Sequence, residues 1–303
     1  MRTLHFKHVD VFTSTPLQGN GLVVFPDAGD LNGDEMQKIA REFNLSETTF
    51  VSNPTSSKAN YKVRIFTPGL ELPFAGHPSV GTAYVLAKEG KRFPLTSPVT
   101  HVKQEIGIGV LPLEIQYDGT QIGRIDMTQG TPRLGRKVEN VQKLADLLKV
   151  PVKDIEATGL SPQVSSTGVN QLMVPVSTLR AVTNLRPDLN GLVDFAKEME
   201  CDAGIYIFTR ETINREADVH ARFFAPDVGV SEDPATGSAA GALGAYLAHS
   251  QSLPHENGQF VVEQGIEIGR PSVIHVQAQQ GEKGLVVKVG GNVVDLIEGQ
   301  IKI

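Results

Sequence analysis

The sequence predicts an α+β protein built from two related halves, and three observations support this. The segment from Arg64 to Ala87 closely resembles the segment from Arg222 to Ala248, and a repeat of this length usually records a duplicated structural unit. Short alternating segments separated by turn residues favour antiparallel strands with a few helices. The segment from Ala239 to Ala248 is apolar on all sides and rich in glycine and alanine. Such a segment is typical of a helix closely surrounded by strands.

Strands are expected where apolar and polar residues alternate. These segments are 6–12, 61–66, 110–115, 124–127, 221–224, 273–277 and 285–289. Apolar residues at 36, 39, 40 and 43 recur at 192, 195, 196 and 199, a constant offset of 156 residues. This spacing predicts one amphipathic helix in each half. A further helix is predicted at 141–149.

Each copy of the repeat is predicted to form a strand, a proline-bearing turn and the start of a helix. The helix starts at Gly76-His77 in the first copy and at Gly237-Ser238 in the second. The first turn of a helix leaves backbone N–H groups unpaired and carries the positive end of the helix dipole. We therefore expect two matched anion-binding helix starts, with a ligand pocket between the halves.

One difference between the halves points to acid/base chemistry. Asn20 and Asn170 each begin a short apolar strand, so this feature is shared. The offset of 156 residues, carried forward, sets Glu47 against Ala203. A glutamate before a strand is usually solvated, but a carboxylate whose counterpart is a methyl group suggests a single acid/base residue on one wall of a shared cleft.

Composition excludes several classes of function. The chain has 303 residues, 20% of them charged, and a net charge of -6. It is long enough for two domains and has no basic surface for nucleic acid. It has neither an apolar run of about 18 residues nor an N-terminal signal pattern, so we expect no membrane association and a cytoplasmic location. Cys201 is the single cysteine, which rules out an intramolecular disulfide and argues against a thiolate zinc site.

Common cofactor and hydrolase motifs are also missing. The segment from Gly107 lacks the remaining glycine and the helix of a dinucleotide fingerprint, and neither a P-loop nor an HExxH motif occurs. Ser238 lies in TGSAAG rather than in a GxSxG elbow. Neither cofactor chemistry nor a hydrolase triad is therefore indicated.

Longer motifs resemble a known family over nearly the whole chain. They are GNGLVVF, NLSETTFV, RIFTPGLELPFAGHPSVGTA, RFFAP, EDPATGSAAGALGAYL, EQGIEIGRPSVIHV and VGGNVV. Together they resemble the phenazine-biosynthesis (PhzF-like) isomerase family, which is similar in fold to diaminopimelate epimerase. The resemblance implies two pseudo-equivalent domains, each a curved, mostly antiparallel sheet around a central helix. We place the N-terminal domain at residues 1–118, with strand 293–303 returning to it, and the C-terminal domain at 119–292. Residues 118–121 are the expected crossover.

The resemblance also implies a reaction. It is the isomerisation of a dihydro-hydroxyanthranilate without metal or organic cofactor, in which a proton leaves one ring carbon and returns to another. Glu47 is implied as the general acid/base. The residues expected to bind the substrate are Asn20, Gly76, His77, Asp233, Gly237 and Ser238. One departure is Gly21, where the family usually has proline.

The positions of two other residues bear on the mechanism. Epimerases and racemases of this fold use two thiols, one per domain, and the matching positions here hold Ala75 and Thr236. Neither side chain can take a proton from carbon, so transfer by one base is favoured. Three functions remain open: a proton-transfer isomerase, an epimerase or lyase on a related substrate, and a non-catalytic metabolite binder. The expected partner is a small carboxylate substrate, with a homodimer as the default oligomeric state.

Overall fold

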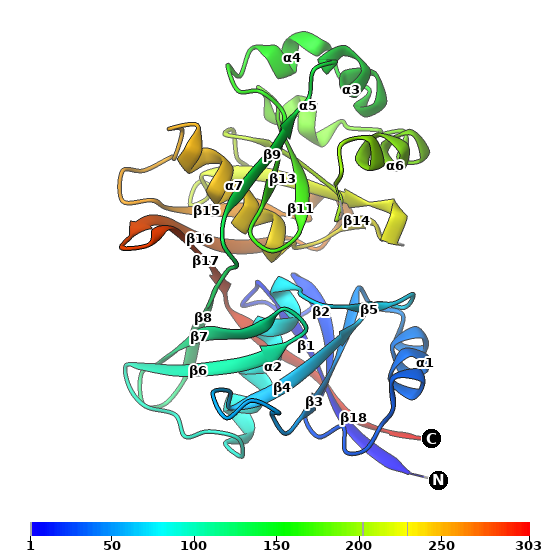
Figure 1. Ribbon diagram of the computed structural model, residues 1–303, viewed down its shortest axis with the longest axis vertical. Coiled ribbons are helices and arrows are strands. Elements are labelled where there is room, and N and C mark those ends of the chain that lie inside the picture. Colours follow the sequence, from blue (N-terminus) through cyan, green and yellow to red (C-terminus); the bar gives the residue numbers. More distant parts are fainter. Residues whose placement is uncertain (1, 202, 229) are drawn as a thin grey trace. The chain divides into compact units, whose positions relative to one another are not determined.

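The computed structural model describes residues 2–201, 203–228 and 230–303. Helices and strands are mixed, which confirms the predicted α+β class. Contacts divide the chain into two compact units, unit 1 (residues 1–128 and 290–303) and unit 2 (residues 129–289). Figure 1 shows unit 1 in blue through cyan to bluish green with the red C-terminal strand, and unit 2 in green through yellow to orange-red. In the part of the chain described, no helix is long and apolar enough to cross a membrane.

Unit 1 is a sheet with strand order β18–β1–β2–β3–β4–β6–β7–β8, and β5 pairs with β4. The pairs β2–β3 and β4–β6 are parallel and the others are antiparallel. The C-terminal strand β18 therefore lies beside β1. The element bounds are β1 Thr3–Val11, β2 Asn20–Phe25, α1 Gly33–Phe43, β3 Glu47–Ser52, β4 Tyr61–Phe66, β5 Glu71–Leu72, α2 Gly76–Glu89, β6 Val99–Ile106, β7 Gly109–Tyr117, β8 Ile122–Thr128 and β18 Val293–Lys302.

Unit 2 repeats this plan with strand order β9–β10–β11–β12–β13–β15–β16, and β14 pairs with β13. Here too the pairs β11–β12 and β13–β15 are parallel. The element bounds are β9 Arg133–Lys137, α3 Val141–Leu148, α4 Val152–Glu156, β10 Gln163–Ser166, β11 Asn170–Pro175, α5 Leu179–Thr183, α6 Leu189–Glu198, β12 Ile205–Thr209, β13 Val219–Ala225, η1 Pro226–Val228, β14 Val230–Asp233, α7 Gly237–His249, β15 Gln259–Gln264, η2 Ile266–Ile268, β16 Ser272–Gly281 and β17 Gly284–Gly291.

The two units share details of side-chain structure. Arg64 on β4 donates from Nε and Nη2 to Glu71, at 2.7 and 2.6 Å. Arg222 on β13 donates in the same way to Glu232, at 2.8 and 2.8 Å. Each guanidinium also lies over the phenylalanine two residues later, 5.1 and 5.0 Å from the ring centre. The matching fork-shaped ion pairs make Arg64 and Arg222 structural counterparts.

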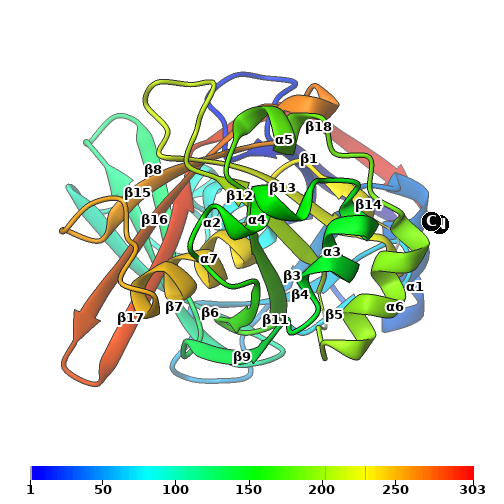
Figure 2. The same cartoon turned by 90° about the horizontal axis from the view of Figure 1, so that it is seen from above.

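The central helices are α2 and α7, and both are buried on nearly all sides, as the sequence predicts. Helix α7 is in contact with β16 and lies beside it in Figures 1 and 2. A Cβ atom at Gly244 would lie 2.9 Å from Cγ1 of Val276. The glycine therefore permits β16 to approach the helix.

The amphipathic helices are confirmed as well. The buried positions of α1 are Met36, Ile39 and Ala40, and those of α6 are Leu192, Phe195 and Ala196. Cys201 is buried in the core cluster that includes this face of α6, as expected for a small apolar side chain.

The expected crossover at residues 118–121 is wrong. Asp118 donates its backbone N–H to Gln121 O at 3.3 Å, and this turn joins β7 to β8, which pair antiparallel. The chain therefore returns to the sheet of unit 1 before unit 2 begins at Gln129. It remains a prediction that residues 119–292 form a domain that folds independently of residues 1–118 and 293–303.

Candidate active site

Three predicted residues of unit 1 come together where strands and the central helix begin. Asn20 opens β2, Glu47 opens β3 and His77 is the second residue of α2. The parallel pair β2–β3 sets Leu22 beside Glu47, so the starts of both strands lie at the same edge of the sheet. Pro78 follows His77 in the first turn of α2, where its missing N–H is tolerated.

Polar contacts link these three side chains. Asn20 Nδ2 lies 3.3 Å from His77 Nδ1, and His77 Nε2 lies 3.2 Å from Glu47 Oε2. The His77 side chain is 5% exposed and that of Glu47 is 15% exposed. His77 Nε2 makes no well-oriented hydrogen bond within the described residues, so its approach to Glu47 is a close polar contact.

The environment of His77 sets its protonation state. Burial lowers the pKa of the imidazole to about 3, so the ring is neutral near pH 7. An amide nitrogen can only donate, and His77 Nδ1 therefore accepts from Asn20. The single ring hydrogen is then on Nε2, on the side of Glu47. A neutral N–H beside a carboxylate can orient that carboxylate without adding a charge.

The second group of predicted residues lies in unit 2. Asp233 ends β14, is 7% exposed, and accepts a hydrogen bond from Thr236 Oγ1 at 2.5 Å. Gln264 on β15 donates to the Asp233 carbonyl at 2.8 Å and to Thr236 Oγ1 at 3.0 Å. Ser238, the second residue of α7, accepts from Gln171 Nε2 at 3.0 Å. These bonds fix the turn that leads into α7.

The starts of α2 and α7 differ from those of the amphipathic helices. Side chains of Asn32 and Asp188 cap α1 and α6. In contrast, Ala75 has no polar atom to cap α2, and the Thr236 hydroxyl bonds to Asp233 instead of capping α7. Among the described residues, neither helix has a side-chain cap from its N-cap position. Their first N–H groups are suited to an anion.

The structure changes the assignment of the residue in unit 2 that is equivalent to Glu47. Thr48 lies opposite Phe66, and Ile205 lies opposite Phe224. Because Phe66 and Phe224 are equivalent, the counterpart of Glu47 is Gly204 rather than Ala203. One extra residue between helix and strand in unit 2 causes this shift. Gly204 has φ +108°, and a Cβ there would lie 2.5 Å from Phe224 O. Unit 2 has no room for a side chain at this position.

Two glutamines near the site were not identified from the sequence, and Asn170 was treated as the counterpart of Asn20. Gln171 and Gln264 are buried polar residues near the ends of strands whose middle positions are apolar, and a glutamine beside an apolar run was the available signal. Asn170, paired with Asn20 in the sequence, instead donates from Nδ2 to the Glu200 carbonyl at 3.2 Å. It thus holds the segment after α6.

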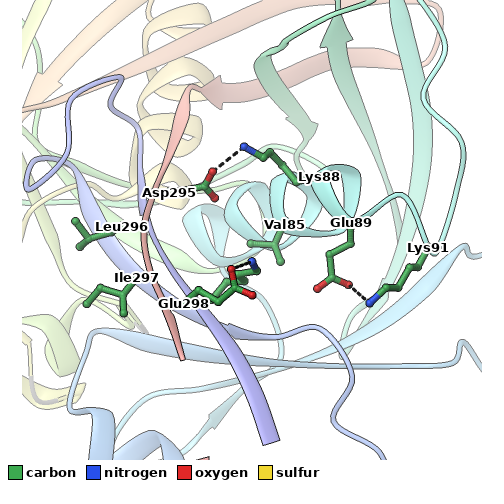
Figure 3. A pocket seen from close by; sticks show the side chains of 9 residues that line it. Val85, Lys88, Glu89, Lys91, Asp295, Leu296, Ile297 and Glu298 are labelled. Atoms are coloured by element: carbon green, nitrogen blue, oxygen red, sulfur yellow. Dashed lines mark hydrogen bonds and ion pairs between the residues drawn. The ribbon is translucent and has the colours of Figure 1, made fainter. Parts of the chain in front are cut away.

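A surface pocket of about 600 Å³ in unit 1 contains none of the predicted site residues. Figure 3 shows it beside the end of α2 and strand β18. Its charged side chains pair with one another: Lys7 with Glu298 at 2.5 Å, Lys88 with Asp295 at 2.8 Å, and Lys91 with Glu89 at 3.6 Å. This pairing gives the pocket no excess charge with which to select a ligand.

The protein has a duplicated α+β fold, with Glu47 beside His77 in unit 1 and with no side-chain cap at the N-cap of either central helix in the described residues. Comparison with known proteins identifies the family that has these features. The family described as phenazine biosynthesis-like protein (PhzC-PhzF) matches residues 9–299. The chain belongs to this family, and it is an isomerase of the PhzF type.

Individual relatives agree with this assignment. Trans-2,3-dihydro-3-hydroxyanthranilate isomerase from Pseudomonas aeruginosa is 36% identical over 294 residues, covering 96% of this chain and 97% of the relative. An uncharacterized isomerase from Clostridium acetobutylicum is 33% identical over 306 residues, covering 99% of both chains.

Solved structures agree as well. A PhzF-family phenazine biosynthesis protein from Bacillus anthracis has a TM-score of 0.88 at 30% identity and 100% coverage of both chains. A hydroxyproline epimerase from Agrobacterium vitis, at 13% identity, has a TM-score of 0.70 and covers 99% of this chain and 92% of its own. The latter similarity concerns the fold alone.

Proposed function

We propose that the protein isomerises a small carboxylated metabolite of the trans-2,3-dihydro-3-hydroxyanthranilate type, using Glu47 as its single acid/base and no cofactor. The main support is the pair formed by Glu47 and neutral His77, 3.2 Å apart, together with a counterpart position, Gly204, that has no side chain. The similarity to dihydro-hydroxyanthranilate isomerases at 36% identity supports the substrate class.

In this mechanism Glu47 accepts a proton from one ring carbon and delivers it to another. The electron pair of the broken C–H bond shifts into the conjugated system of the substrate, and a pair from the same system forms the new C–H bond. Atoms and charge therefore balance without an oxidant or a second base. His77 presents its Nε2–H to the carboxylate at 3.2 Å, and this contact is proposed to orient Glu47 when substrate is bound.

The remaining predicted residues are assigned to substrate binding. The N–H groups at Gly76 and Gly237 are proposed to hold the carboxylate and the developing negative charge. Asn20 positions His77, while Asp233 and Ser238 are proposed to bind polar groups of the same substrate. That residues of both units act on one substrate remains a prediction, as does a homodimer, which light scattering would test.

The proton route is tested by running the reaction in deuterated water with trans-2,3-dihydro-3-hydroxyanthranilate as substrate. We expect one deuterium at the carbon that receives the proton, less the fraction that Glu47 returns before exchange. Mass spectrometry gives the number of deuterium atoms and NMR gives their position. Inversion at one carbon would instead indicate an epimerase, and elimination a lyase. Binding without conversion would indicate a metabolite binder.

A further inference from the structure

A buried glutamine on β11 holds the hydroxyl group of Ser238. The Gln171 side chain is 0% exposed, and its Nε2 donates to Ser238 Oγ at 3.0 Å. A serine hydroxyl has one hydrogen to donate and two lone pairs to accept with. Gln171 occupies one lone pair and leaves the hydrogen available. Within the described residues, that hydrogen has no acceptor.

The duplicated scaffold does not require an amide at this position. The register that makes Gly204 the counterpart of Glu47 also makes Leu22 the counterpart of Gln171. Unit 1 therefore builds the same strand with an apolar side chain. In addition, Gln171 Oε1 is buried without a hydrogen-bond partner in the described part of the chain. An unpaired buried carbonyl oxygen lowers stability, so the amide is costly to the fold.

We propose that Gln171 is a positioning residue that directs the Ser238 hydroxyl hydrogen toward an anionic oxygen of the substrate. This inference rests on the proposed function and specifies what Ser238 binds, namely an oxygen that accepts a hydrogen bond. Ser238 is partly exposed at the start of α7. The hydroxyl therefore adds one directed donor to the N–H groups of this helix start.

Unit 1 contains a matched control. Gln104 is also 0% exposed and donates from Nε2 to Ser79 Oγ at 2.5 Å. In contrast to Ser238, Ser79 donates its hydroxyl hydrogen to the Ala75 carbonyl at 2.9 Å. Gln104 Oε1 lies 3.5 Å from the Tyr61 hydroxyl. This second glutamine thus belongs to a closed network with a structural role.

The test compares Gln171→Leu, Gln171→Met, Gln104→Leu, Ser238→Ala and the double variant Gln171→Leu/Ser238→Ala. We expect both Gln171 variants to lower kcat/KM about tenfold and to weaken binding of 3-hydroxyanthranilate by a similar factor. Their urea midpoints should equal or exceed that of the wild type. The double variant should be no worse than Ser238→Ala. Gln104→Leu should lower the urea midpoint and leave kcat/KM unchanged.

Three outcomes would overturn the inference. Wild-type kcat/KM in the Gln171 variants would show that the amide does not act on Ser238. Losses that multiply in the double variant would show that the two residues act separately. A lower urea midpoint in both Gln171 variants would assign the amide to the fold. A wild-type protein that neither binds nor converts these compounds would instead refute the proposed function on which the inference rests.

Discussion

His77 is held neutral between an amide and a carboxylate, and this arrangement makes the fold sensitive to acid. The imidazole pKa falls to about 3 because the ring is buried, whereas a histidine in the unfolded chain titrates near 6.5. Between these two values the unfolded chain binds a proton that the folded protein does not. Stability therefore decreases as the pH falls below about 6.5.

This effect can be measured with His77→Gln, which removes the titrating group. Between pH 8 and pH 4.5 we expect the wild type to lose about 2 to 3 kcal/mol more unfolding free energy than the variant. Urea unfolding of both proteins at the two pH values gives the difference, and other titrating groups cancel in the comparison. Equal losses would show that His77 is protonated in the folded protein.

At the residue scale, the sequence indicated those site residues that lie in long motifs. Asn20, Glu47 and His77 are each part of such a motif, and the structure brings them into contact. Gln171 and Gln264 could not be found in this way, because a glutamine beside a short apolar run does not reveal its partner. Their bonds to Ser238 and Thr236 depend on tertiary packing.

A buried glutamate links the two strands of the parallel pair β4–β6 in unit 1, and another links the equivalent pair β13–β15 in unit 2. In unit 1, Glu105 on β6 accepts from the N–H groups of Thr55 and Ser56 and pairs with Lys62 at 3.1 Å. The hydrogen bond from Thr55 and its other partners lower the Glu105 pKa to about 2. In unit 2, Glu263 on β15 accepts from two backbone N–H groups and pairs with His220 at 2.8 Å.

His220 adds a third member to the cluster in unit 2. Its Nε2 lies 2.8 Å from Glu267, so the imidazole bridges two carboxylates. Burial alone would lower the pKa of His220, but hydrogen bonds and the charges of Glu263 and Glu267 outweigh it and raise the pKa to about 9. The stabilisation from this charge is complete below about pH 6.5 and is lost as the pH rises through 9.

We therefore expect His220→Gln to cost about 3 to 5 kcal/mol at pH 6, because the buried Glu263 and the partly buried Glu267 would lose their cation. The cost should shrink at pH 9.5, where His220 of the wild type has lost its charge. Urea unfolding at both pH values measures it, with Lys62→Gln as the more exposed counterpart. An equal cost at the two pH values would contradict the charged state of His220.

At the element scale, periodicity revealed many of the longer elements, although β6, with eight residues, was not predicted. The predicted strands correspond to β1, β4, β7, β8, β13, β16 and β17. The sequence did not reveal α4 and α5, which have five residues each, because one helical turn shows no period. The turn at residues 118–121 was misinterpreted because a hairpin turn and a crossover share the same turn residues.

For the whole molecule, the duplication explains both the common scaffold and the difference in chemistry. The repeat in the sequence predicted two alike units, and matching ion pairs at Arg64 and Arg222 appear in both. The sequence could not show that the counterpart of Glu47 is Gly204. The offset of 156 residues was taken from α1 and α6, and it could not reveal the one extra residue between α6 and β12.

The domain limits can be tested by expressing residues 119–292 alone. A domain with its own core should show a cooperative thermal transition, and the core cluster around Leu172, Phe195 and Ile207 lies wholly within this fragment. Circular dichroism during heating measures the transition. The absence of a cooperative transition would show that these limits do not enclose an independent domain.

The most direct test of the account is the turnover of trans-2,3-dihydro-3-hydroxyanthranilate by Glu47→Gln. Its control is Glu42→Gln, which removes the same charge from an exposed residue of α1. General acid/base catalysis commonly contributes about 100- to 10,000-fold. We predict a loss of kcat in this range for Glu47→Gln, with retained binding of 3-hydroxyanthranilate and an unchanged urea midpoint, and wild-type kcat for Glu42→Gln. A Glu47→Gln protein with wild-type kcat would contradict the single-carboxylate mechanism.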